Sequence, residues 1–408
     1  MHIRRRLLAP YHYLWALGAA LWYRFPARKL TVIGVTGTKG KSSVAEMLYT
    51  ILTEAGYATA LAGTIRFSIG KESRPNLYKM TLPGRGFIQK FLAEAVTKQC
   101  TYAVVELTSE AALQYRHLGI MLDALIFTNL QKEHVESHGS MEKYFQAKFR
   151  FGKALARSPK NPRSIIAQKD DAFSAAFLAL PVENKISFSL SDAREVHLNE
   201  NGVSFTYGGT PFSLALPGTF TVNNALAAIK TAEVFHIPLE TAARALRELS
   251  HISGRVERVE CGQDFLAVVD YAHTPDSLQA LYDAYPTKRK ICVLGNTGGG
   301  RDTWKRPLMG KIAADACAEV ILTNEDPYDE DPRAIVEAMT RDMARPPRII
   351  MDRREAIRQA LTLARAGDAV LISGKGTDPF IMGAKGSKIP WSDSRVVREE
   401  LQRLHTEI

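Results

Sequence analysis

Residues 36–43 of this 408-residue chain read Thr-Gly-Thr-Lys-Gly-Lys-Ser-Ser and follow a short apolar run. Glycines let backbone N–H groups approach phosphate oxygens, and a helix that starts just after them adds a partial positive charge. Lys41 stands where a lysine neutralises the β- and γ-phosphates, and a hydroxyl at Ser42 or Ser43 can hold Mg²⁺. The strict G-x-x-x-x-G-K-[ST] spacing fails, because Gly34 lies one residue too early. The pattern predicts a nucleotide-phosphate site, against the alternative of an ordinary glycine-rich turn between strand and helix. The residues expected to line it are Thr36, Gly37, Thr38, Lys39, Gly40, Lys41, Ser42 and Ser43.

Three more polar residues stand where they could reach a nucleotide and its metal. Glu106 follows an apolar strand, and acidic residues at strand ends of phosphate-binding proteins commonly reach the metal. His134 and Lys148 lie in the segment 127–153. Taken singly, a solvated loop histidine and a surface helix lysine are the commoner interpretations of these two residues.

Three clusters follow later in the chain. Residues 254–257 (Gly-Arg-Val-Glu) offer a guanidinium, and residues 269–276 (Val-Asp-Tyr-Ala-His-Thr-Pro-Asp) put polar side chains directly after an apolar strand. Residues 298–307 form a second glycine-rich loop with several cations. Loops at the carboxyl ends of parallel strands are where ligands bind in doubly wound sheets. Two such loops indicate a reaction that uses two domains.

The elements that would position these residues alternate between strand and helix. From Leu30 to about Leu249 the alternation predicts a mostly parallel sheet with helices on both faces, and residues 185–216 predict hairpins at its edge. A second series from Arg255 predicts a smaller Rossmann-like domain. The expected fold class is α/β, with a leader at 1–29, a central ATP-binding domain at 30–250 and a C-terminal domain at 251–408.

Bulk composition narrows the class of partner. The 53 Lys+Arg against 43 Asp+Glu give a net charge of +10, so an anionic partner such as a nucleotide, a phosphorylated substrate or an anionic membrane is expected. Nucleic acid is not expected, because no basic run interleaved with aromatics follows the first thirty residues. The four cysteines lack metal-ligand spacing and predict reduced thiols in a cytoplasmic protein.

The first 29 residues begin with three arginines and continue into an aromatic-rich apolar segment. The segment is too short and too polar to span a bilayer comfortably. Two interpretations stay open: an interfacial helix that gives residues 1–28 a peripheral membrane contact, and a helix packed on the first domain.

With these residues assembled, the chain resembles the Mur ligase superfamily, and within it the UDP-N-acetylmuramoyl-tripeptide synthetase (MurE-type) branch. The resemblance runs from about Leu30 to Leu401. The motifs that carry it are TGTKGKSS, the strand ending at Glu106, FTNL, YFQAK, LPGTFTVNNALAA, GRVE, VDYAHTPDSL, GGGRDTWKRPLMG, EDPYDEDP and SGKGTDPF. The resemblance implies a central ATPase domain, a C-terminal Rossmann-like domain, and ligation of an amino acid to a carboxylate through an acyl phosphate.

The resemblance also implies roles for the nucleotide-binding residues. Lys41 would bind the terminal phosphates, and Ser42, Glu106 and His134 would ligate Mg²⁺. Lys148 matches a lysine that CO₂ carbamylates, so that it becomes a ligand for a second Mg²⁺. The remaining nucleotide contacts would be Asn129 and Asn224 near the base, with Arg255 and Asp270 toward the γ-phosphate and ribose. The residues implied in catalysis are Lys41, His134, Lys148 and Arg255.

The residues expected to bind the acceptor match the family pattern less completely than those expected to bind the nucleotide. Thr81, Thr108, Gln114 and Arg116 match positions that hold the muramyl peptide, whereas Glu110 replaces a family histidine. The acceptor-side match therefore implies a muramyl-peptide-type substrate with one altered contact.

The amino-acid site departs further. Its matched residues are His273, Arg301, Asp326, Tyr328, Gly374 and Asp378. The family's D-N-P-R signature for diaminopimelate reads Glu325-Asp326-Pro327-Tyr328 here. An arginine there would pair bidentately with the distal carboxylate of diaminopimelate, and Tyr328 cannot. The acidic loop favours an amino acid with a cationic or uncharged distal end, lysine being one candidate.

The largest departure is at the front. Family members carry an N-terminal domain of roughly a hundred residues that holds the UDP part of the substrate, whereas about thirty residues precede the loop strand here. Either UDP is bound differently or the acceptor has no UDP. The rival functions are a folylpolyglutamate-synthetase-like ligase, a cyanophycin-type ligase, and a non-catalytic nucleotide-binding subunit.

Overall fold

The computed structural model describes residues 2–84, 86–133 and 138–406, which form two compact units. Unit 1 comprises Met1–His197, Ser204–Leu214 and Phe220–Leu249; unit 2 comprises Leu198–Val203, Ala215–Thr219 and Ser250–Ile408.

Unit 1 is built on an eight-stranded sheet. Its strands, in order across the sheet, are β4 (Glu72–Pro75), β3 (Arg66–Ile69), β2 (Thr59–Ala62), β5 (Tyr102–Leu107), β1 (Thr31–Thr36), β6 (Ala124–Phe127), β7 (Ser164–Gln168) and β8 (Asn184–Phe188). Only β3 and β4 run antiparallel to their neighbours. In the register, Thr36 pairs with both Leu107 and Phe127, so three strand ends meet at one edge. The expected mostly parallel α/β architecture is confirmed.

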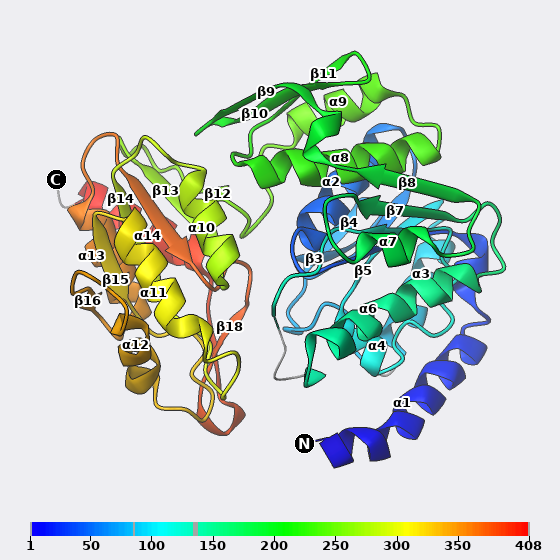
Figure 1. Ribbon diagram of the computed structural model, residues 1–408, viewed down its shortest axis with the longest axis horizontal. Helices are drawn as coiled ribbons and strands as arrows, with labels where there is room; N and C mark the ends of the chain where they lie inside the picture. Colours follow the sequence, from blue (N-terminus) through cyan, green and yellow to red (C-terminus); the bar gives the residue numbers. More distant parts are fainter. Residues whose placement is uncertain (1, 85, 134–137, 407–408) are drawn as a thin grey trace. The chain divides into compact units, whose positions relative to one another are not determined.

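Helices cover both faces of this sheet. They are α2 (Lys41–Glu54), α3 (Phe87–Thr97), α4 (Ser109–Leu113), α6 (Met141–Ala156), α7 (Ser174–Leu178), α8 (Thr219–Val234) and α9 (Leu239–Glu248). In Figure 1, α2 and α8 lie above the sheet, and α3, α6 and α7 lie below it. A single apolar core joins the lower helices to the sheet residues Val32, Val105 and Phe127. This burial fixes the strand ends that carry the polar residues.

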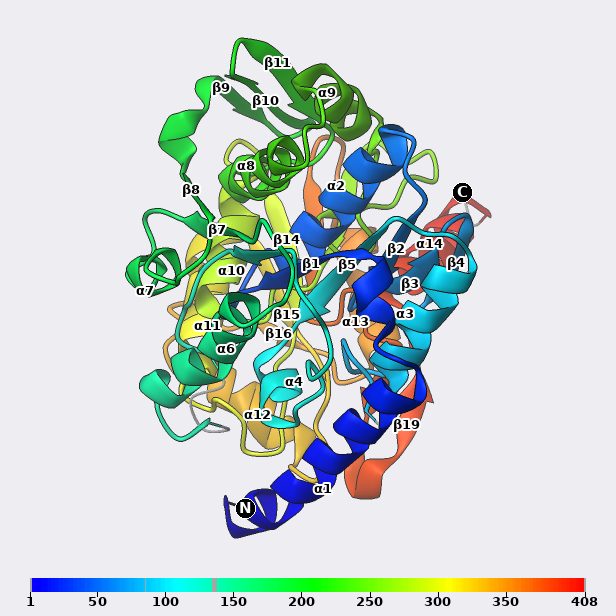
Figure 2. The same cartoon turned by 90° about the vertical axis from the view of Figure 1, so that its right-hand side faces the viewer.

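The first helix, α1 (His2–Trp22), projects from unit 1 in both views (Figures 1 and 2). Its chain turns through left-handed backbone at Arg24 and Phe25 into the short 3-10 helix η1 (Pro26–Lys29). Ala20 and Ala27 are buried in the unit. Among residues 2–406 outside the two gaps, no helix has the length and apolarity needed to cross a membrane.

The hairpins expected at the edge of the large sheet instead form a sheet of their own. Strands β9 (Arg194–Asn199), β10 (Gly202–Tyr207) and β11 (Thr210–Leu214) pair in the order β11-β10-β9. The stacked rings of Phe205 and Phe212, 5.3 Å apart, give this sheet its own buried face. The sequence prediction was wrong about the sheet, because alternating strands reveal a hairpin but not its neighbour.

Unit 2 contains a six-stranded sheet and a separate hairpin. The sheet order is β12 (Glu257–Arg258), β13 (Leu266–Asp270), β17 (Ala369–Ser373), β14 (Lys290–Leu294), β15 (Glu319–Leu322) and β16 (Arg348–Ile349). Only β12 is antiparallel. The helices are α10 (Pro275–Asp283), α11 (Lys305–Ala316), α12 (Pro332–Thr340), α13 (Arg353–Leu363) and α14 (Asp393–Thr406), and the hairpin joins β18 (Phe380–Met382) to β19 (Lys388–Pro390) around η3 (Ala384–Gly386).

The expectation of four reduced thiols was wrong for one pair. Cys292 and Cys317 form a disulfide with their Cα atoms 6.2 Å apart, whereas Cys100 and Cys261 are free. The pairing follows from topology: Cys292 lies opposite Val320 in the parallel β14–β15 register, and Cys317 lies two residues before β15. Sequence spacing alone does not reveal that neighbourhood.

Candidate functional site

The glycine loop of unit 1 runs from the end of β1 into α2 and leaves no room for side chains at its glycines. A Cβ at Gly37 would overlap Thr128 Oγ1, and one at Gly40 would overlap Asn224 Oδ1. Both residues also have positive φ, 148° and 81°. Gly34, the glycine that breaks the standard spacing, lies inside β1, where an added Cβ would be 2.7 Å from Leu107 Cδ1. The loop glycines are therefore Gly37 and Gly40, as the core pattern G-T-K-G-K-S predicts.

Residues after β6 brace this loop. Thr38 N donates to the carbonyl of Asn129 (2.8 Å), and Lys39 N donates to Asn129 Oδ1 (2.9 Å). Asn129 Nδ2 and Thr128 Oγ1 both donate to the Lys39 carbonyl. The Thr36 hydroxyl donates to the Leu107 carbonyl at 3.0 Å. Asn129 thus shapes the loop, a role that its expected place near the base did not include.

The loop lysines have partners within unit 1. Lys41 Nζ donates to the Thr38 carbonyl at 2.9 Å, and Lys39 Nζ pairs with Glu133 Oε2 at 3.1 Å. Ser42 is buried in the first turn of α2, and Ser43 follows it there. Two lysines, a helix N-terminus and the loop N–H groups make this a cradle for an anion.

Glu106 connects the loop with the acceptor side. Ser42 Oγ donates to both Glu106 carboxylate oxygens, at 3.1 and 3.2 Å. The Thr64 backbone N–H donates to Glu106 Oε2 at 2.8 Å, and the Thr64 and Thr81 hydroxyls lie 2.7 Å apart. A predicted metal ligand, Glu106, and a predicted acceptor contact, Thr81, are therefore linked through Thr64.

Lys148 lies on α6 and is fully buried. Its Nζ donates to the Gly37 carbonyl at 2.5 Å and lies 4.6 Å from the centre of the Tyr144 ring. Burial lowers the pKa of Lys148 well below its ordinary value, and the nearby Lys41 cation lowers it further. The surface-lysine interpretation was therefore wrong, and the residue belongs to the loop site.

The described part of the site suits phosphate and Mg²⁺ in its chemistry. Gly37 and Gly40 let the loop pass close to Thr128 and Asn224 into the N-terminus of α2, and Ser42 with Glu106 supplies the hard oxygen donors that Mg²⁺ prefers. His134 lies outside the described residues. Within residues 2–84, 86–133 and 138–406, no group of three or more His, Cys, Asp or Glu side chains is arranged for a metal.

The predicted acceptor residues gather around Arg116. Its guanidinium donates to Gln114 Oε1 at 2.5 Å and to the Leu82 carbonyl, next to Thr81. Gln114 in turn donates to Glu110 Oε1 at 2.7 Å. Thr108 instead caps α4, since its hydroxyl accepts from Ala111 N. Glu110, which replaces the family histidine, thus orients Gln114.

In unit 2, Arg255 and Asp270 lie at neighbouring strand ends. The Arg255 guanidinium stacks 4.5 Å from the Tyr271 ring centre, and Asp270 accepts from Val256 N and Ala272 N. A Cβ at Gly254 would lie 2.6 Å from Thr377 N, so the loop before Arg255 packs on the loop after β17. Asp270 therefore lies close to Arg255, because it accepts from the N–H of the following residue, Val256.

The second glycine-rich loop places Arg301 over Tyr328, with 4.8 Å from the guanidinium carbon to the ring centre. Arg306 pairs with Glu330 at 2.6 Å, and Lys305 Nζ donates to the His273 carbonyl at 2.8 Å. Of the predicted residues, Arg301 and Tyr328 therefore contact each other, and His273 is bonded through its carbonyl to Lys305 at the start of α11.

Asp326 has a more structural place than predicted. Its Oδ1 accepts from Lys375 Nζ and from Met382 N, both at 2.8 Å, and Lys375 also donates to Asp378 at 3.3 Å. Gly374 has φ 107°, and a Cβ there would overlap Glu325 Oε2. Burial raises the pKa of the Glu325 carboxyl, and the nearby Asp326 raises it further.

Sequence reasoning did not assign Lys375, Thr64 and Tyr144 to the sites. Lys375 is a buried cation in a glycine-rich string, Thr64 follows β2 beside β5, and the Tyr144 hydroxyl lies 3.2 Å from Thr38 Oγ1. A lysine between two glycines was the available signal for Lys375. The other two carry no local signal, because only the fold brings them to the loop.

Comparison with known proteins agrees with this geometry. The family model described as the Mur ligase middle domain matches residues 35–232, and that of the Mur ligase, glutamate ligase domain, matches residues 254–376. A UDP-N-acetylmuramoyl-L-alanyl-D-glutamate–2,6-diaminopimelate ligase of Caldanaerobacter subterraneus subsp. tengcongensis is 35% identical over 399 residues, which cover 94% of this chain and 80% of the relative.

Solved structures extend the comparison. A diaminopimelate ligase of the same description aligns with a TM-score of 0.62 and 28% identity, over 92% of this chain and 79% of the other. Folylpolyglutamate synthase of Mycobacterium tuberculosis aligns with a TM-score of 0.73 but 17% identity, over 89% and 92% of the two chains, so it shares the fold. With both domain models matched and this identity over most of its length, the chain belongs to the Mur ligase family, as its motifs predict.

Proposed function

We propose that this Mur ligase joins an amino acid to the carboxylate of a muramyl-peptide-type acceptor in peptidoglycan synthesis, at the expense of ATP. The observation that carries this proposal is the position of Glu106, whose carboxylate holds Ser42 of the phosphate loop and, through Thr64, Thr81 of the acceptor segment. A phosphoryl donor and a carboxylate acceptor would meet on either side of this one side chain.

The chemistry needs charge neutralisation and positioning. A carboxylate is a poor acyl donor, so the γ-phosphoryl group is transferred to it, and the amine then attacks the acyl phosphate and expels inorganic phosphate. Lys41 and the loop N–H groups would hold the phosphate oxygens, and Arg255 and Asp270 keep the nucleotide-contacting roles that the resemblance implies. Bound Mg²⁺, with Ser42, Glu106 and His134 as its proposed ligands, would supply the remaining positive charge.

For Lys148 we propose N-carboxylation. Carbon dioxide reacts with an uncharged amine, and burial together with the nearby Lys41 cation lowers the pKa of Lys148, although Glu133 and Glu106 act in the opposite sense. The modification would turn the amine into an anionic ligand for a second Mg²⁺. A structure with ADP and Mg²⁺ should show a carboxyl extension on Nζ, and an unmodified amine beside the metal would refute this role.

For the amino acid we propose a cationic or uncharged distal end, with lysine as one candidate. Tyr328 replaces the arginine that would pair with the distal carboxylate of diaminopimelate. Two acids of the same loop, Asp326 and Glu330, are already paired with Lys375 and Arg306. The relatives named as diaminopimelate ligases therefore do not settle the amino acid used here.

We propose a cytoplasmic enzyme with a peripheral membrane contact through residues 1–28. For the acceptor, UDP-linked and UDP-free muramyl dipeptides are the two forms to compare. Activity with the UDP-free form would show that the enzyme does not need the UDP moiety, and activity with the UDP-linked form alone would show that it does.

The deciding experiment measures phosphate release over a matrix of acceptors and amino acids. Release that needs both a muramyl dipeptide and an amino acid supports the proposal. Release with folates and glutamate would favour the folylpolyglutamate-type alternative, whose support is the shared fold. ATP binding without any amino-acid-dependent release would favour a non-catalytic subunit.

A further inference from the structure

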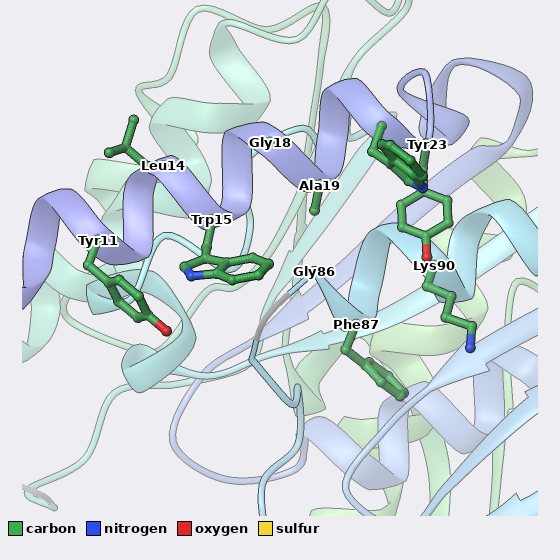
Figure 3. A pocket seen from close by; sticks show the side chains of 10 residues that line it. Tyr11, Leu14, Trp15, Gly18, Ala19, Tyr23, Gly86, Phe87 and Lys90 are labelled. Atoms are coloured by element: carbon green, nitrogen blue, oxygen red, sulfur yellow. The ribbon is translucent and has the colours of Figure 1, made fainter.

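A groove of about 640 Å³ runs between α1 and the start of α3 in unit 1. Aromatic side chains from both elements line it, together with one lysine, as Figure 3 shows. These residues are Tyr11, Trp15, Trp22, Tyr23, Phe87 and Lys90. Tyr11 and Trp15 hang from the same side of α1, with their rings 6.4 Å apart (Figure 3).

The apolar side chains of α1 are largely exposed. The exposed fractions are 44% for Tyr11, 64% for Leu14, 50% for Trp15, 58% for Leu21 and 81% for Trp22. Spacings of three, four and seven residues place them on one stripe of the helix. Isolated exposed apolar residues are ordinary, but a continuous stripe with two indoles marks an interaction surface.

The N-terminal segment that carries this stripe is strongly basic. The first acidic residue of the chain is Glu46, and the first thirty residues contain six cations: Arg4, Arg5, Arg6, Arg24, Arg28 and Lys29. Three of these arginines lie in the opening turns of α1. On α3, Lys90 has an exposed side chain 3.8 Å from Glu94. Such a segment is attracted to an anionic surface and repelled by a cationic one.

Small residues of the helix hold it on unit 1. The Ala19 and Ala20 methyl groups lie where a Cβ at Gly86 or Gly119 would be, at 2.6 and 2.8 Å. The rings of Tyr13 and Tyr115 contact each other edge to face at 5.5 Å. Since close contact at two glycines fixes the helix, the aromatic stripe keeps its direction relative to the unit.

We propose that α1 and the start of α3 form a docking surface for an anionic bilayer, with α1 lying in the plane of the interface. Tryptophan and tyrosine favour the headgroup level, where their rings are apolar and their polar ends are hydrated. Apolar residues on one stripe of a helix and an excess of arginines over acids in the same segment are the combination that binds such helices to lipid. The surface adjoins Tyr115, between Gln114 and Arg116, so an acceptor held as in the proposed function would lie beside the membrane.

The test uses the full chain and needs no substrate. Co-sedimentation with vesicles of phosphatidylglycerol and phosphatidylcholine should show binding that falls as salt rises, and phosphatidylcholine vesicles alone should bind much less. Trp15→Ala with Trp22→Ala should lower the partition coefficient roughly a hundredfold. Arg4→Gln, Arg5→Gln and Arg6→Gln together should lower it by a similar factor, about fivefold each.

Matched controls are Leu198→Ala and Ile389→Ala, which remove apolar side chains of 49% and 57% exposure elsewhere. They should bind like the unaltered chain. Amino-acid-dependent phosphate release with a soluble acceptor should be unchanged in the tryptophan variants, so loss of docking and loss of ligation can be told apart.

A second measurement does not depend on weakened binding. Lipids brominated near the headgroup should quench tryptophan fluorescence of the unaltered chain, and Trp15→Phe with Trp22→Phe should abolish quenching while binding persists. Absence of binding to anionic vesicles, or binding that the alanine substitutions leave intact, would overturn the proposal. Concentration-dependent dimers that the same substitutions dissociate, without vesicle binding, would assign the stripe to a second copy of the chain instead.

Discussion

The two glycine-rich loops of this protein resemble each other in sequence but differ in how the fold uses their charges. In the loop of unit 1, Gly37 and Gly40 press against Thr128 and Asn224, and the loop lysines Lys39 and Lys41 lie near the buried Lys148. In the loop of unit 2, a Cβ at Gly298 would also overlap a neighbour, the Pro327 carbonyl oxygen, whereas one at Gly300 would meet nothing within 4 Å, and Arg306 is paired with Glu330.

The difference separates two requirements. Phosphate binding needs a fixed backbone and nearby positive charge, so the first loop is braced from three strands. Recognition of an amino acid needs side chains of a particular charge and shape. In the second loop, the Asp326–Lys375 ion pair and the Arg301–Tyr328 contact determine which charges and groups are presented. We infer that the first loop binds the phosphates needed for the reaction and that the second loop selects the amino acid.

The largest expected effect is at Lys148. We expect Lys148→Ala to lower amino-acid-dependent phosphate release by about 10³-fold, since it removes a group buried within the loop site. The substitution also leaves a cavity where the buried four-carbon chain was, so some loss of stability is expected, and activity is compared below the unfolding temperature of the variant. Steady-state phosphate release and thermal unfolding would measure the two effects.

The control for that variant is Lys153→Ala on the same helix, where the lysine is exposed and lies 5.3 Å from the Phe149 ring. It should retain nearly full activity. An equal loss of phosphate release in both variants would mean that α6 supports the fold only. Lys148 would then have no specific role at the first loop, and the proposed difference between the two loops would be wrong there.

The next effect is on stability in unit 2. Lys375→Met should lower the free energy of unfolding by about 3–5 kcal/mol, because it leaves the buried Asp326 carboxylate without its cation. Breaking the partly exposed Lys39–Glu133 pair with Lys39→Met should cost about 1 kcal/mol or less. Urea unfolding of both variants measures the difference. Equal costs would show that Asp326 is not held by Lys375 in solution.

A third prediction compares alanine at two glycines with positive φ, only one of which has a neighbouring side chain where the new methyl group would be. Gly40 and Gly300 both have positive φ, at 81° and 69°, so alanine at either should cost about 1 kcal/mol of stability. Only Gly40→Ala also overlaps a neighbour, Asn224. ATP affinity should therefore fall about tenfold or more in Gly40→Ala and stay within about threefold in Gly300→Ala. Titration of a fluorescent ATP analogue gives both values, and weakened binding in the second variant alone would reverse the comparison.

Sequence patterns predicted most of the first loop, because its contacts follow from local rules. A glycine loop after an apolar strand predicts the cradle, and three parallel strand ends bring Glu106 and Asn129 to it. The burial of Lys148 could not be derived from α6 alone, since helical periodicity gives its face but not the neighbouring Gly37 carbonyl.

The second loop was harder to predict for a physical reason. Whether an acid such as Asp326 faces a substrate or a buried lysine depends on how the loop after β15 packs against the loop after β17, which is far away in the sequence. The acidic residues in the sequence predicted a negatively charged loop. In the structure, Lys375 and Arg306 neutralise two of these residues, Asp326 and Glu330. The same limit applies to Cys292 and Cys317, which only the sheet register brings together.

The smallest predicted effect tests whether the second loop selects the amino acid. Tyr328→Arg should raise the ratio of kcat/KM for meso-diaminopimelate over lysine by roughly tenfold, since a guanidinium at that position can pair with the distal carboxylate. Tyr328 already has positive φ, 53°, so arginine adds no new backbone strain. The control Tyr328→Phe keeps the ring under Arg301 and should leave the ratio unchanged. A folded Tyr328→Arg variant with an unchanged ratio would show that another residue recognises the distal end of the amino acid. The inference that the second loop selects the substrate would then be unsupported.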